Sequence, residues 1–302
     1  MTQKPDTIVV LMTYNHASDL PQCLDSLANQ TYKNFHMIVV DDVSSDSSFE
    51  IVKSYEGRFA NFTAIKNEKN RGAVGNLHFI LELAKSKEPQ AEFILWASPD
   101  DWWAPQFLEK TRNGLIANPQ AVVCFSDYEK INMQTDVVQQ QVLCSVRGDS
   151  YAESRKIFRP YKTPGGSATF NSVIHGLIRF SELHNFLPSN EQSLMYACAC
   201  ELSILVAMLM RGQILIIPEI LFYKRQYGRY ADKHPTDRLA AYYRSIFKRP
   251  LIALWHLPRL IKMRRSDRSL LFAILMWMNL FYIYGVVSTG VMVRNLLKRK
   301  SA

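Results

Sequence analysis

Residues 7–42 read TIVVLMTYNHASDLPQCLDSLANQTYKNFHMIVVDD, and this stretch decides the fold. It opens with an apolar, β-branched run over Thr7–Met12 and passes through a polar turn into Asp19–Asn29, where apolar residues recur at helical spacing. It closes with a second apolar run, Phe35–Val40. Two runs of strand length joined by a segment of helix length predict a β-α-β unit with parallel strands.

The same alternation continues along the chain. A Ser-rich segment precedes a predicted helix at Phe49–Tyr55, and a strand at Phe62–Ile65, a helix at Val74–Ala84 and a strand at Phe93–Trp96 follow. Alternating strands and helices are typical of an α/β fold with a doubly wound, mostly parallel sheet flanked by helices. We therefore predict this fold class for the first half of the chain.

Polar turns follow four of the predicted strands. They contain Tyr14-Asn15, Asp41-Asp42, Asn70-Arg71-Gly72 and Asp100-Asp101. Such residues populate many ordinary turns, so no single turn identifies a site. Ligands of doubly wound sheets, however, bind at the carboxyl ends of the strands, where these turns are expected to meet. Adjacent carboxylates suit a hard divalent cation such as Mg²⁺ or Mn²⁺ bound to a diphosphate.

The charge of the chain is unevenly distributed. The 302 residues include 36 Lys and Arg and 27 Asp and Glu, and 17 of the basic but only three of the acidic residues lie in residues 224–302. A basic segment of this kind favours contact with an anionic membrane surface or a nucleic acid. The acidic balance of the first 223 residues argues against RNA binding. Five cysteines without metal-ligand spacing predict reduced thiols in a cytoplasmic protein.

The C-terminal segment is both basic and apolar. Tyr242–Arg268 interleaves aromatic and aliphatic residues with Lys and Arg, a composition suited to an anionic membrane interface. Leu270–Val293 has no charged residue over 24 positions, enough for a helix to cross a bilayer. A spanning helix, a helix lying in the interface and a soluble packing helix all fit this segment. We predict a helical extension at the inner face of the cell membrane, either peripheral or with one C-terminal span.

Four segments together resemble a known family. TIVVLMTYN (7–15), QTYKNFHMIVVDDVSSDSS (30–48), NRGAVGN (70–76) and ILWASPDDWWAPQFLEK (94–110) are similar, in order and spacing, to the family 2 inverting glycosyltransferases of the GT-A fold. The resemblance implies transfer of a sugar from a nucleotide-diphospho-sugar donor to an acceptor hydroxyl, with a divalent metal, Mn or Mg, as cofactor. It also implies that the sheet is a GT-A sheet.

The resemblance assigns roles to residues of the turns. Asp42 matches the carboxylate that contacts the nucleotide base, and Asp100 matches the metal ligand, with Asp101 as its neighbour in the metal site. Ser98 stands where many members have a further Asp. The residues expected to bind the donor nucleotide are Tyr14, Asn15, Asp42, Asn70, Arg71, Gly72 and, at the diphosphate, Arg225.

The catalytic base is expected on a later helix. Counting back from the predicted helix end at Arg211-Gly212, the resemblance gives Glu201, with Glu191 as the competing candidate. A carboxylate there would take the proton from the attacking acceptor hydroxyl. Gly176 is expected to let the backbone approach the acceptor, and His175 to pack or to contact the acceptor. Arg225 could equally just open the basic tail.

These observations divide the chain by function. We expect a nucleotide-sugar-binding half in residues 1–125, an acceptor-binding half with the catalytic base in residues 126–223, and a basic, membrane-associated helical tail in residues 224–302. Tyr128–Thr163 is polar and Gln-rich and is interpreted as a loop-rich insertion, with a strand at Gln213–Ile217. The expected acceptor is a surface glycan or a lipid-linked oligosaccharide. A non-catalytic member that binds sugar nucleotides or glycans as a scaffold remains the alternative, and the oligomeric state stays open.

Overall fold

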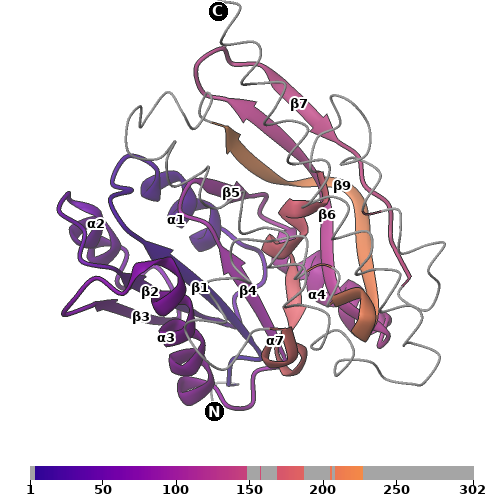
Figure 1. Cartoon of the computed structure of the whole chain (residues 1–302), viewed down its shortest axis with the longest axis horizontal. Helices are drawn as coiled ribbons and strands as arrows, with labels where there is room; N and C mark the ends of the chain where they lie inside the picture. Colours follow the sequence, from indigo (N-terminus) through magenta and orange to yellow (C-terminus); the bar gives the residue numbers. More distant parts are fainter. Residues whose placement is uncertain (1–3, 148–156, 158–168, 187–204, 206–207, 227–302) are drawn as a thin grey trace, which may run out of the picture.

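The computed structural model describes residues 4–147, 157, 169–186, 205 and 208–226 (Figure 1). Its first half is a parallel sheet formed by β1 (Thr7–Thr13), β2 (Phe35–Asp41), β3 (Asn61–Lys66) and β4 (Phe93–Ala97), with β1 between β2 and β4. Nearly every residue of β1 and β2 is buried. Strands buried on both faces read as continuous apolar runs, which is why these two were recognisable in the sequence.

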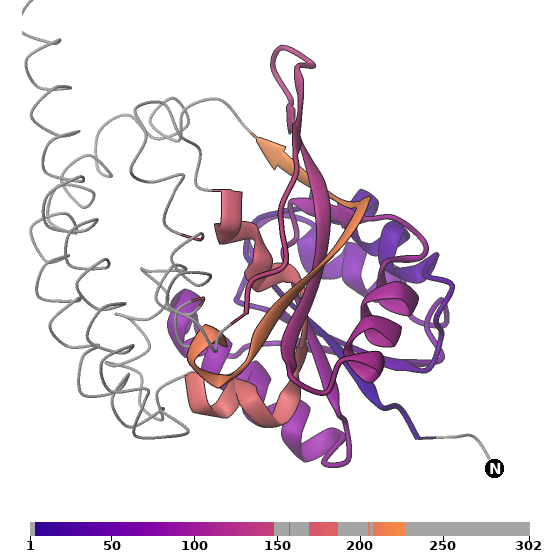
Figure 2. The ribbon, with the colours of Figure 1, turned by 90° about the vertical axis from the view of Figure 1, so that its right-hand side faces the viewer.

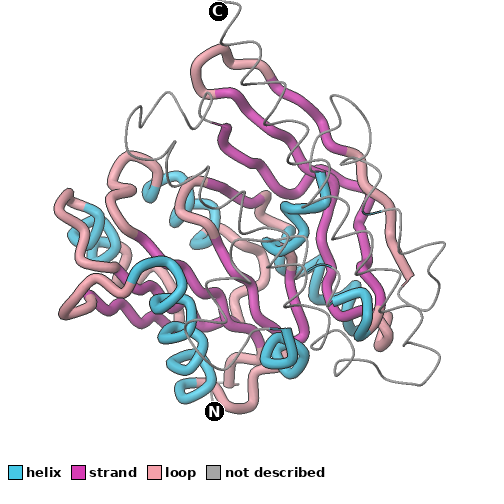
Figure 3. Tube along the Cα trace, viewed as in Figure 1, coloured by secondary structure: helices cyan, strands magenta, loops and turns pink. Residues whose placement is uncertain are grey.

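Helices connect the parallel strands. These are α1 (Leu20–Ala28), α2 (Ser48–Ser54), α3 (Gly72–Lys87) and, after β4, α4 (Phe107–Ala117). The core-facing stripe of α1 consists of Leu20, Cys23, Leu24, Leu27 and Ala28, all buried, at the spacing that places side chains on one helical face. Helices and strands therefore alternate as predicted (Figure 3).

The sheet continues into the second half of the described chain. The added strands are β5 (Asp101–Trp103), β6 (Ala121–Asn132), β8 (Leu177–Arg179) and β9 (Gln213–Gln226), and the strand order is β3-β2-β1-β4-β8-β6-β9-β5. The pairs β1–β2, β1–β4, β2–β3 and β6–β9 are parallel, whereas β8 runs antiparallel to both β4 and β6. A short helix, η2 (Thr169–His175), precedes β8, and α7 (Phe180–Phe186) follows it. The predicted α/β fold with a mostly parallel sheet is confirmed.

An aromatic cluster packs β5, β6, β9 and α4 together. Its members contact one another at ring-centroid distances of 5.3–6.4 Å and are Trp103, Phe107, Phe125, Tyr128 and Phe222. All five are almost completely buried. Buried aromatic pairs contribute about 0.5–1.5 kcal/mol each beyond their burial. The cluster fixes β5 and β9, which carry site residues, against β6.

One expectation about secondary structure is wrong. The predicted loop-rich insertion at Tyr128–Thr163 begins inside β6, which runs to Asn132, and it also contains β7 (Val138–Gln141), paired antiparallel with β6. The two strands form a hairpin that projects from the body of the protein (Figure 2). Val138 and the three glutamines are mostly exposed, so this strand buries no apolar face and shows no alternation of apolar and polar residues. The later part of the insertion lies largely outside the described residues.

The proposed functional halves do not coincide with breaks in the sheet. The boundary at residue 125 falls inside β6, and the boundary at residue 223 falls inside β9. The basic tail, including Leu270–Val293, lies outside the described residues apart from Lys224, Arg225 and Gln226. No helix within the described part of the chain combines the length and the apolar character needed to cross a membrane.

Candidate functional site

The polar turns of the parallel strands meet at one edge of the sheet. The first contacts run through the main chain, because Asp42 N donates to Thr13 O at 2.9 Å and Asn67 N donates to Asp41 O at 2.9 Å. The ends of β1, β2 and β3 are thereby fixed side by side, as expected for neighbouring parallel strands. This edge is the candidate functional site.

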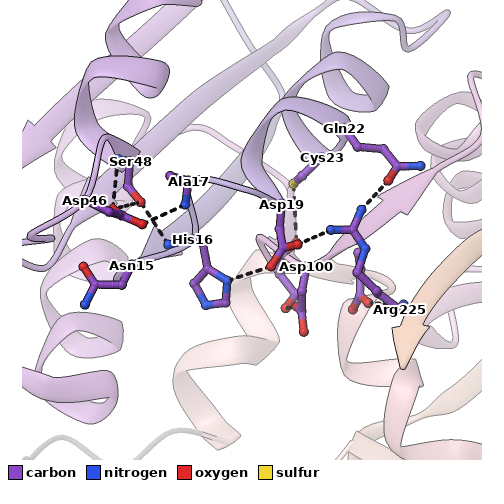
Figure 4. Close-up of polar contacts among 12 residues, drawn as sticks. Asn15, His16, Ala17, Asp19, Gln22, Cys23, Asp46, Ser48, Asp100 and Arg225 are labelled. Atoms are coloured by element: carbon purple, nitrogen blue, oxygen red, sulfur yellow. Dashed lines mark hydrogen bonds and ion pairs between the residues drawn. The ribbon is translucent and has the colours of Figure 1, made fainter. Parts of the chain in front are cut away.

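The loop after β1 is clamped to the loop after β2. Asn15 adopts a positive φ of 57°, and its Oδ1 accepts a hydrogen bond from Ser45 N at 2.8 Å. Asn15 N donates to Ser44 Oγ at 2.9 Å, and Ala17 N donates to Asp46 Oδ2 at 3.0 Å (Figure 4). Asn is one of the few side chains that tolerate this backbone region. The two loops therefore form one rigid rim, from which Tyr14 extends with 51% of its surface exposed.

Asp42 organises the start of α3. Its buried carboxylate accepts hydrogen bonds from Arg71 N and Gly72 N, both at 2.9 Å, and from Asn67 Nδ2 at 2.7 Å. Asn70 Nδ2 donates to Asp42 O at 3.0 Å. A carboxylate at a helix N-terminus satisfies free N–H groups and interacts favourably with the helix dipole. The structure thus brings Asp42, Asn70, Arg71 and Gly72 together, with Asp42 bound to the protein's own donors.

Asp100 and Asp101 have different surroundings. Asp100 is partly exposed, and its Oδ1 accepts a hydrogen bond from the Ser98 hydroxyl. Asp101 is 1% exposed; its Oδ1 accepts from Arg225 N at 3.0 Å and its Oδ2 lies 3.5 Å from Lys224 Nζ. Burial raises the pKa of Asp101 to about 7, which Lys224 opposes and the Asp100 charge reinforces. Asp101 is therefore held by β9, while Asp100 is left at the surface of the site.

The donor set of this turn fits a divalent cation that also binds a diphosphate. Such cations commonly take one or two protein carboxylates and complete their shell with phosphate oxygens and water. The described residues contain no group of three or more His, Cys, Asp or Glu side chains that could hold a metal by themselves. The partly exposed Asp100 carboxylate could supply the protein's share, and Ser98 orients one of its oxygens.

Arg225 lies in a network that the sequence did not predict. Its guanidinium donates to the carboxylate of Asp19 and to Gln22 Oε1, and it stands 5.3 Å from the ring centroid of Trp102 (Figure 4). Arg225 is only 8% exposed. Its expected contact with a diphosphate stays a prediction, and that contact would have to compete with these bonds.

Two further predicted residues are explained by packing. His175 is buried, stacks on Phe222 at 5.8 Å, and its Nδ1 lies 3.0 Å from Trp96 O. Burial, together with the nearby Lys224 charge, lowers the pKa of His175 to about 4. A Cβ on Gly176 would lie 2.7 Å from Cys124 O, so this glycine permits close packing of its backbone on β6. Glu201 and Glu191 lie outside the described residues.

Sequence reasoning missed several residues of the site. Ser44, Asn67 and Lys224 contact predicted residues directly, and Asp46 holds the loop that carries Asn15 through Ala17 N. The Ser-rich turn after Asp42 was a usable signal for Ser44 and Asp46, because Ser and Asp side chains accept hydrogen bonds from turn N–H groups. Asp19 gave no such signal. Its partner Arg225 is 206 residues away in the sequence.

The sheet order and the flanking helices define a class of protein, the α/β proteins of the GT-A fold. Two solved structures share the fold. Staphylococcus aureus TarS 1–349 in complex with UDP-GlcNAc aligns with a TM-score of 0.59 and 18% identity, covering 93% of this chain and 72% of that one. The Pyrobaculum calidifontis mannosyltransferase PcManGT in complex with GDP-Man and Mn²⁺ aligns with a TM-score of 0.57 and 16% identity, covering 100% and 76%.

The chain belongs to glycosyl transferase family 2, whose family model matches residues 8–183. A similar curated relative is the putative glycosyltransferase EpsH of Bacillus subtilis, 31% identical over 143 residues, which are 45% of this chain and 39% of EpsH. The chain therefore matches well under half of this relative's length. The family-model range, residues 8–183, includes the converging turns, in agreement with the resemblance seen in the sequence.

Proposed function

We propose that this protein is a metal-dependent inverting glycosyltransferase that moves a sugar from a nucleotide-diphospho-sugar to an acceptor hydroxyl. One observation carries the proposal: the partly exposed Asp100 carboxylate follows β4, whose parallel neighbour β1 carries the rim of loops at its carboxyl end. Doubly wound sheets bind nucleotides at this position. The TarS complex with UDP-GlcNAc supports the donor class, and the PcManGT complex with GDP-Man and Mn²⁺ supports the cofactor.

In this proposal the chain's residues bind and orient the donor. Tyr14 and Asn15 face the nucleotide from the rim, and Asp42 keeps the start of α3, with Asn70 to Gly72, in place. Asp100 is the protein ligand of the cation, and Asp101 supports the turn from within. A cation bound there would neutralise the charge of the leaving diphosphate.

The catalytic base is proposed from the resemblance alone. Glu201 would accept the proton of the acceptor hydroxyl while that oxygen attacks the anomeric carbon from the face opposite the nucleotide. We propose a surface glycan or a lipid-linked oligosaccharide as acceptor. The basic tail would hold the enzyme at the inner face of the membrane.

A thermal-shift panel tests the donor and metal sites. UDP, GDP, dTDP and CDP are each added with and without Mn²⁺ to the wild type and to Asp100→Asn. A ligand at 100 times its Kd stabilises the folded state by about 2.7 kcal/mol. We expect one nucleotide to stabilise the wild type in an Mn²⁺-dependent way and Asp100→Asn to lose that dependence. Glu56→Gln, a surface carboxylate with 66% side-chain exposure, is the matched control. Unchanged Mn²⁺ dependence in Asp100→Asn would contradict the assignment.

The base is tested by donor binding and transfer measured together. Glu201→Gln should retain donor binding and lose transfer to a membrane-extract acceptor, whereas Glu191→Gln should retain both. Transfer by Glu201→Gln at the wild-type rate would place the base elsewhere.

The membrane proposal is tested with the full chain. Cosedimentation with phosphatidylglycerol vesicles should be strong in low salt and fall as salt is raised. Equal recovery with neutral phosphatidylcholine vesicles would contradict an electrostatic contact.

Ser98 favours a second candidate function. Its hydroxyl replaces a carboxylate of the usual turn and bonds to Asp100, which reduces the negative charge available to a cation. A non-catalytic member that binds sugar nucleotides or glycans as a scaffold would show donor binding without transfer to any acceptor extract.

A further inference from the structure

One face of α1 is polar where it meets the metal-binding turn. Cys23 and Ser26 lie on α1, Asp19 and Gln22 lie at its start, and Gln30 follows its end. The spacing of positions 19, 22, 23 and 26 places them along one side of the helix, and Gln30 follows two residues after its end. We call these five residues the α1 polar stripe.

The α1 polar stripe holds the segment from Ser98 to Leu108. Cys23 Sγ donates to Ser98 O at 3.4 Å, and Ser26 Oγ accepts from Trp103 N at 3.2 Å. Gln30 Nε2 donates to Ala104 O at 2.8 Å, and Gln30 Oε1 accepts from Leu108 N at 2.9 Å. The segment that carries Asp100 and Asp101 is therefore held by the α1 polar stripe at four main-chain atoms, of Ser98, Trp103, Ala104 and Leu108.

Asp19 connects this stripe to both sides of the site. Its Oδ2 lies 3.3 Å from His16 Nδ1, in the loop that carries Tyr14 and Asn15. Its Oδ1 binds the guanidinium of Arg225, whose own main-chain N–H donates to Asp101 Oδ1 at 3.0 Å. Figure 4 shows His16 and Arg225 reaching Asp19 from opposite sides.

The Asp19–Arg225 ion pair is buried, so its geometry has little freedom to change. Asp19 is 7% exposed and Arg225 is 8% exposed, and their mutual contact is charge-assisted. A buried charge that loses its partner is strongly disfavoured, so removal of Asp19 should displace the Arg225 guanidinium even though Gln22 also binds it. Movement of Arg225 would shift the main-chain N–H that holds Asp101.

We propose that Asp19 is a positioning residue, which acts through Arg225 to hold the Asp100–Asp101 turn in register with the nucleotide-facing loop. Asp19 touches neither donor nor metal in this account. Its role is to keep Asp100 and the nucleotide-facing loop at the distance needed to bind the cation and the diphosphate together. The inference rests on the proposed function, and it assigns Arg225 an internal partner in place of the diphosphate.

The test measures Mn²⁺ binding directly. Mn²⁺ is titrated into the full chain in the presence of UDP and, in a parallel experiment, of GDP. Electron paramagnetic resonance measures the Mn²⁺ that stays free. Loss of residues that orient a metal ligand typically weakens metal affinity by about 10- to 100-fold. We expect a weakening of at least about 10-fold for Asp19→Asn and for Arg225→Gln, with the double variant no weaker than the worse single one. Arg225→Lys keeps the positive charge but loses the planar guanidinium that can bind two acceptors. We expect its Mn²⁺ affinity to lie between those of the wild type and Arg225→Gln.

Two controls separate positioning from loss of stability. Asp25→Asn removes a carboxylate of the same helix that binds Tyr55 and Arg58, away from the turn. Leu27→Ala removes buried volume from α1 and lowers stability. Both should bind Mn²⁺ as the wild type does. If Asp19→Asn does not fold, Arg225→Lys carries the test alone.

The outcomes distinguish this inference from the proposed function. Wild-type binding of Mn²⁺ with equal binding by Asp19→Asn, or an equal loss in Leu27→Ala, would overturn the positioning role and leave the proposed function intact. Absence of nucleotide-dependent Mn²⁺ binding in the wild type would instead overturn the proposed metal dependence, and the inference with it.

Discussion

Replacement of Asp42 by alanine should destabilise the protein as well as weaken nucleotide binding. The carboxylate is 4% exposed and accepts three hydrogen bonds, from Arg71 N, Gly72 N and Asn67 Nδ2. A residue whose only role was to contact a nucleotide base could be removed from the free protein at little cost in stability. The stability of an Asp42 variant therefore distinguishes a carboxylate that only contacts the ligand from one that stabilises the fold.

The expected cost follows from these three donors. Arg71 and Gly72 are exposed, so water can reach their N–H groups once the carboxylate is gone, and the loss resembles that of a helix cap, about 1 kcal/mol. Asn67 is 7% exposed and its Nδ2 keeps Asn76 Oδ1 as an acceptor at 3.1 Å, so losing Asp42 leaves one of its two N–H groups unpaired at a cost of about 1–3 kcal/mol. Together these give about 2–4 kcal/mol. Asp42→Asn keeps an oxygen for Arg71 and Asn67 but turns an NH₂ toward Gly72 N–H, so we expect about half that loss.

Urea unfolding monitored by circular dichroism measures this free energy, and calorimetric titration with UDP and Mn²⁺ measures binding. Glu56→Gln should unfold at the wild-type urea concentration, since surface substitutions usually change stability by less than about 0.5 kcal/mol. The reasoning is refuted if Asp42→Ala unfolds with the wild type while losing nucleotide affinity. That result would mean that the carboxylate faces the ligand and not the start of α3.

Three further predictions concern the rest of the site. Gly176→Ala should cost about 1–3 kcal/mol in urea unfolding, because its Cβ would lie 2.7 Å from Cys124 O; an altered KM for acceptor at unchanged stability would contradict this packing role. Tyr14→Ala should leave stability within about 0.5 kcal/mol and weaken UDP binding by about fivefold or more, since its ring is half exposed on the rim; wild-type affinity in calorimetry would count against a nucleotide contact. His175 has a folded pKa of about 4, below the ordinary 6.5, so its contribution to stability is complete above pH 6.5 and is lost as the pH falls toward 4. Between pH 7 and pH 5 this amounts to about 2 kcal/mol, which His175→Gln should no longer lose in parallel urea titrations; identical pH slopes would show that His175 is not buried neutral.

The sequence predicted the elements whose signals are local. β1 and β2 are apolar along their whole length because both faces are covered, and the core-facing residues of α1 repeat at helical spacing. β5, with three residues, is defined only by its pairing with β9, more than 100 residues later. β7 buries no apolar face, so its Val and Gln residues carry no alternation. Short or exposed strands depend on partners that a local pattern does not contain.

The candidate site was predictable in composition and not in geometry. The rule that ligand-binding turns follow strands located Asn15, Asp42 and Asp100. It could not show that Asp42 is occupied by the main chain of α3, or that Asp101 faces β9 while Asp100 is partly exposed. In the sequence the adjacent carboxylates Asp100 and Asp101 are indistinguishable. In the structure they differ in the direction of their side chains, one toward β9 and the other toward the surface. That difference is fixed by the register of β5 against β9.

The α1 polar stripe has a consequence for changing the donor preference of the protein by exchanging loops. The loop that carries Tyr14 continues directly into α1, and the α1 polar stripe hydrogen-bonds the segment from Ser98 to Leu108. A loop transplanted alone from another protein would enter α1 at a different angle. The α1 polar stripe would then no longer align with the main-chain atoms of residues 98–108. The smallest transferable module is therefore discontinuous: it comprises the loop, α1 and residues 98–108, and chimeras should be cut at its borders.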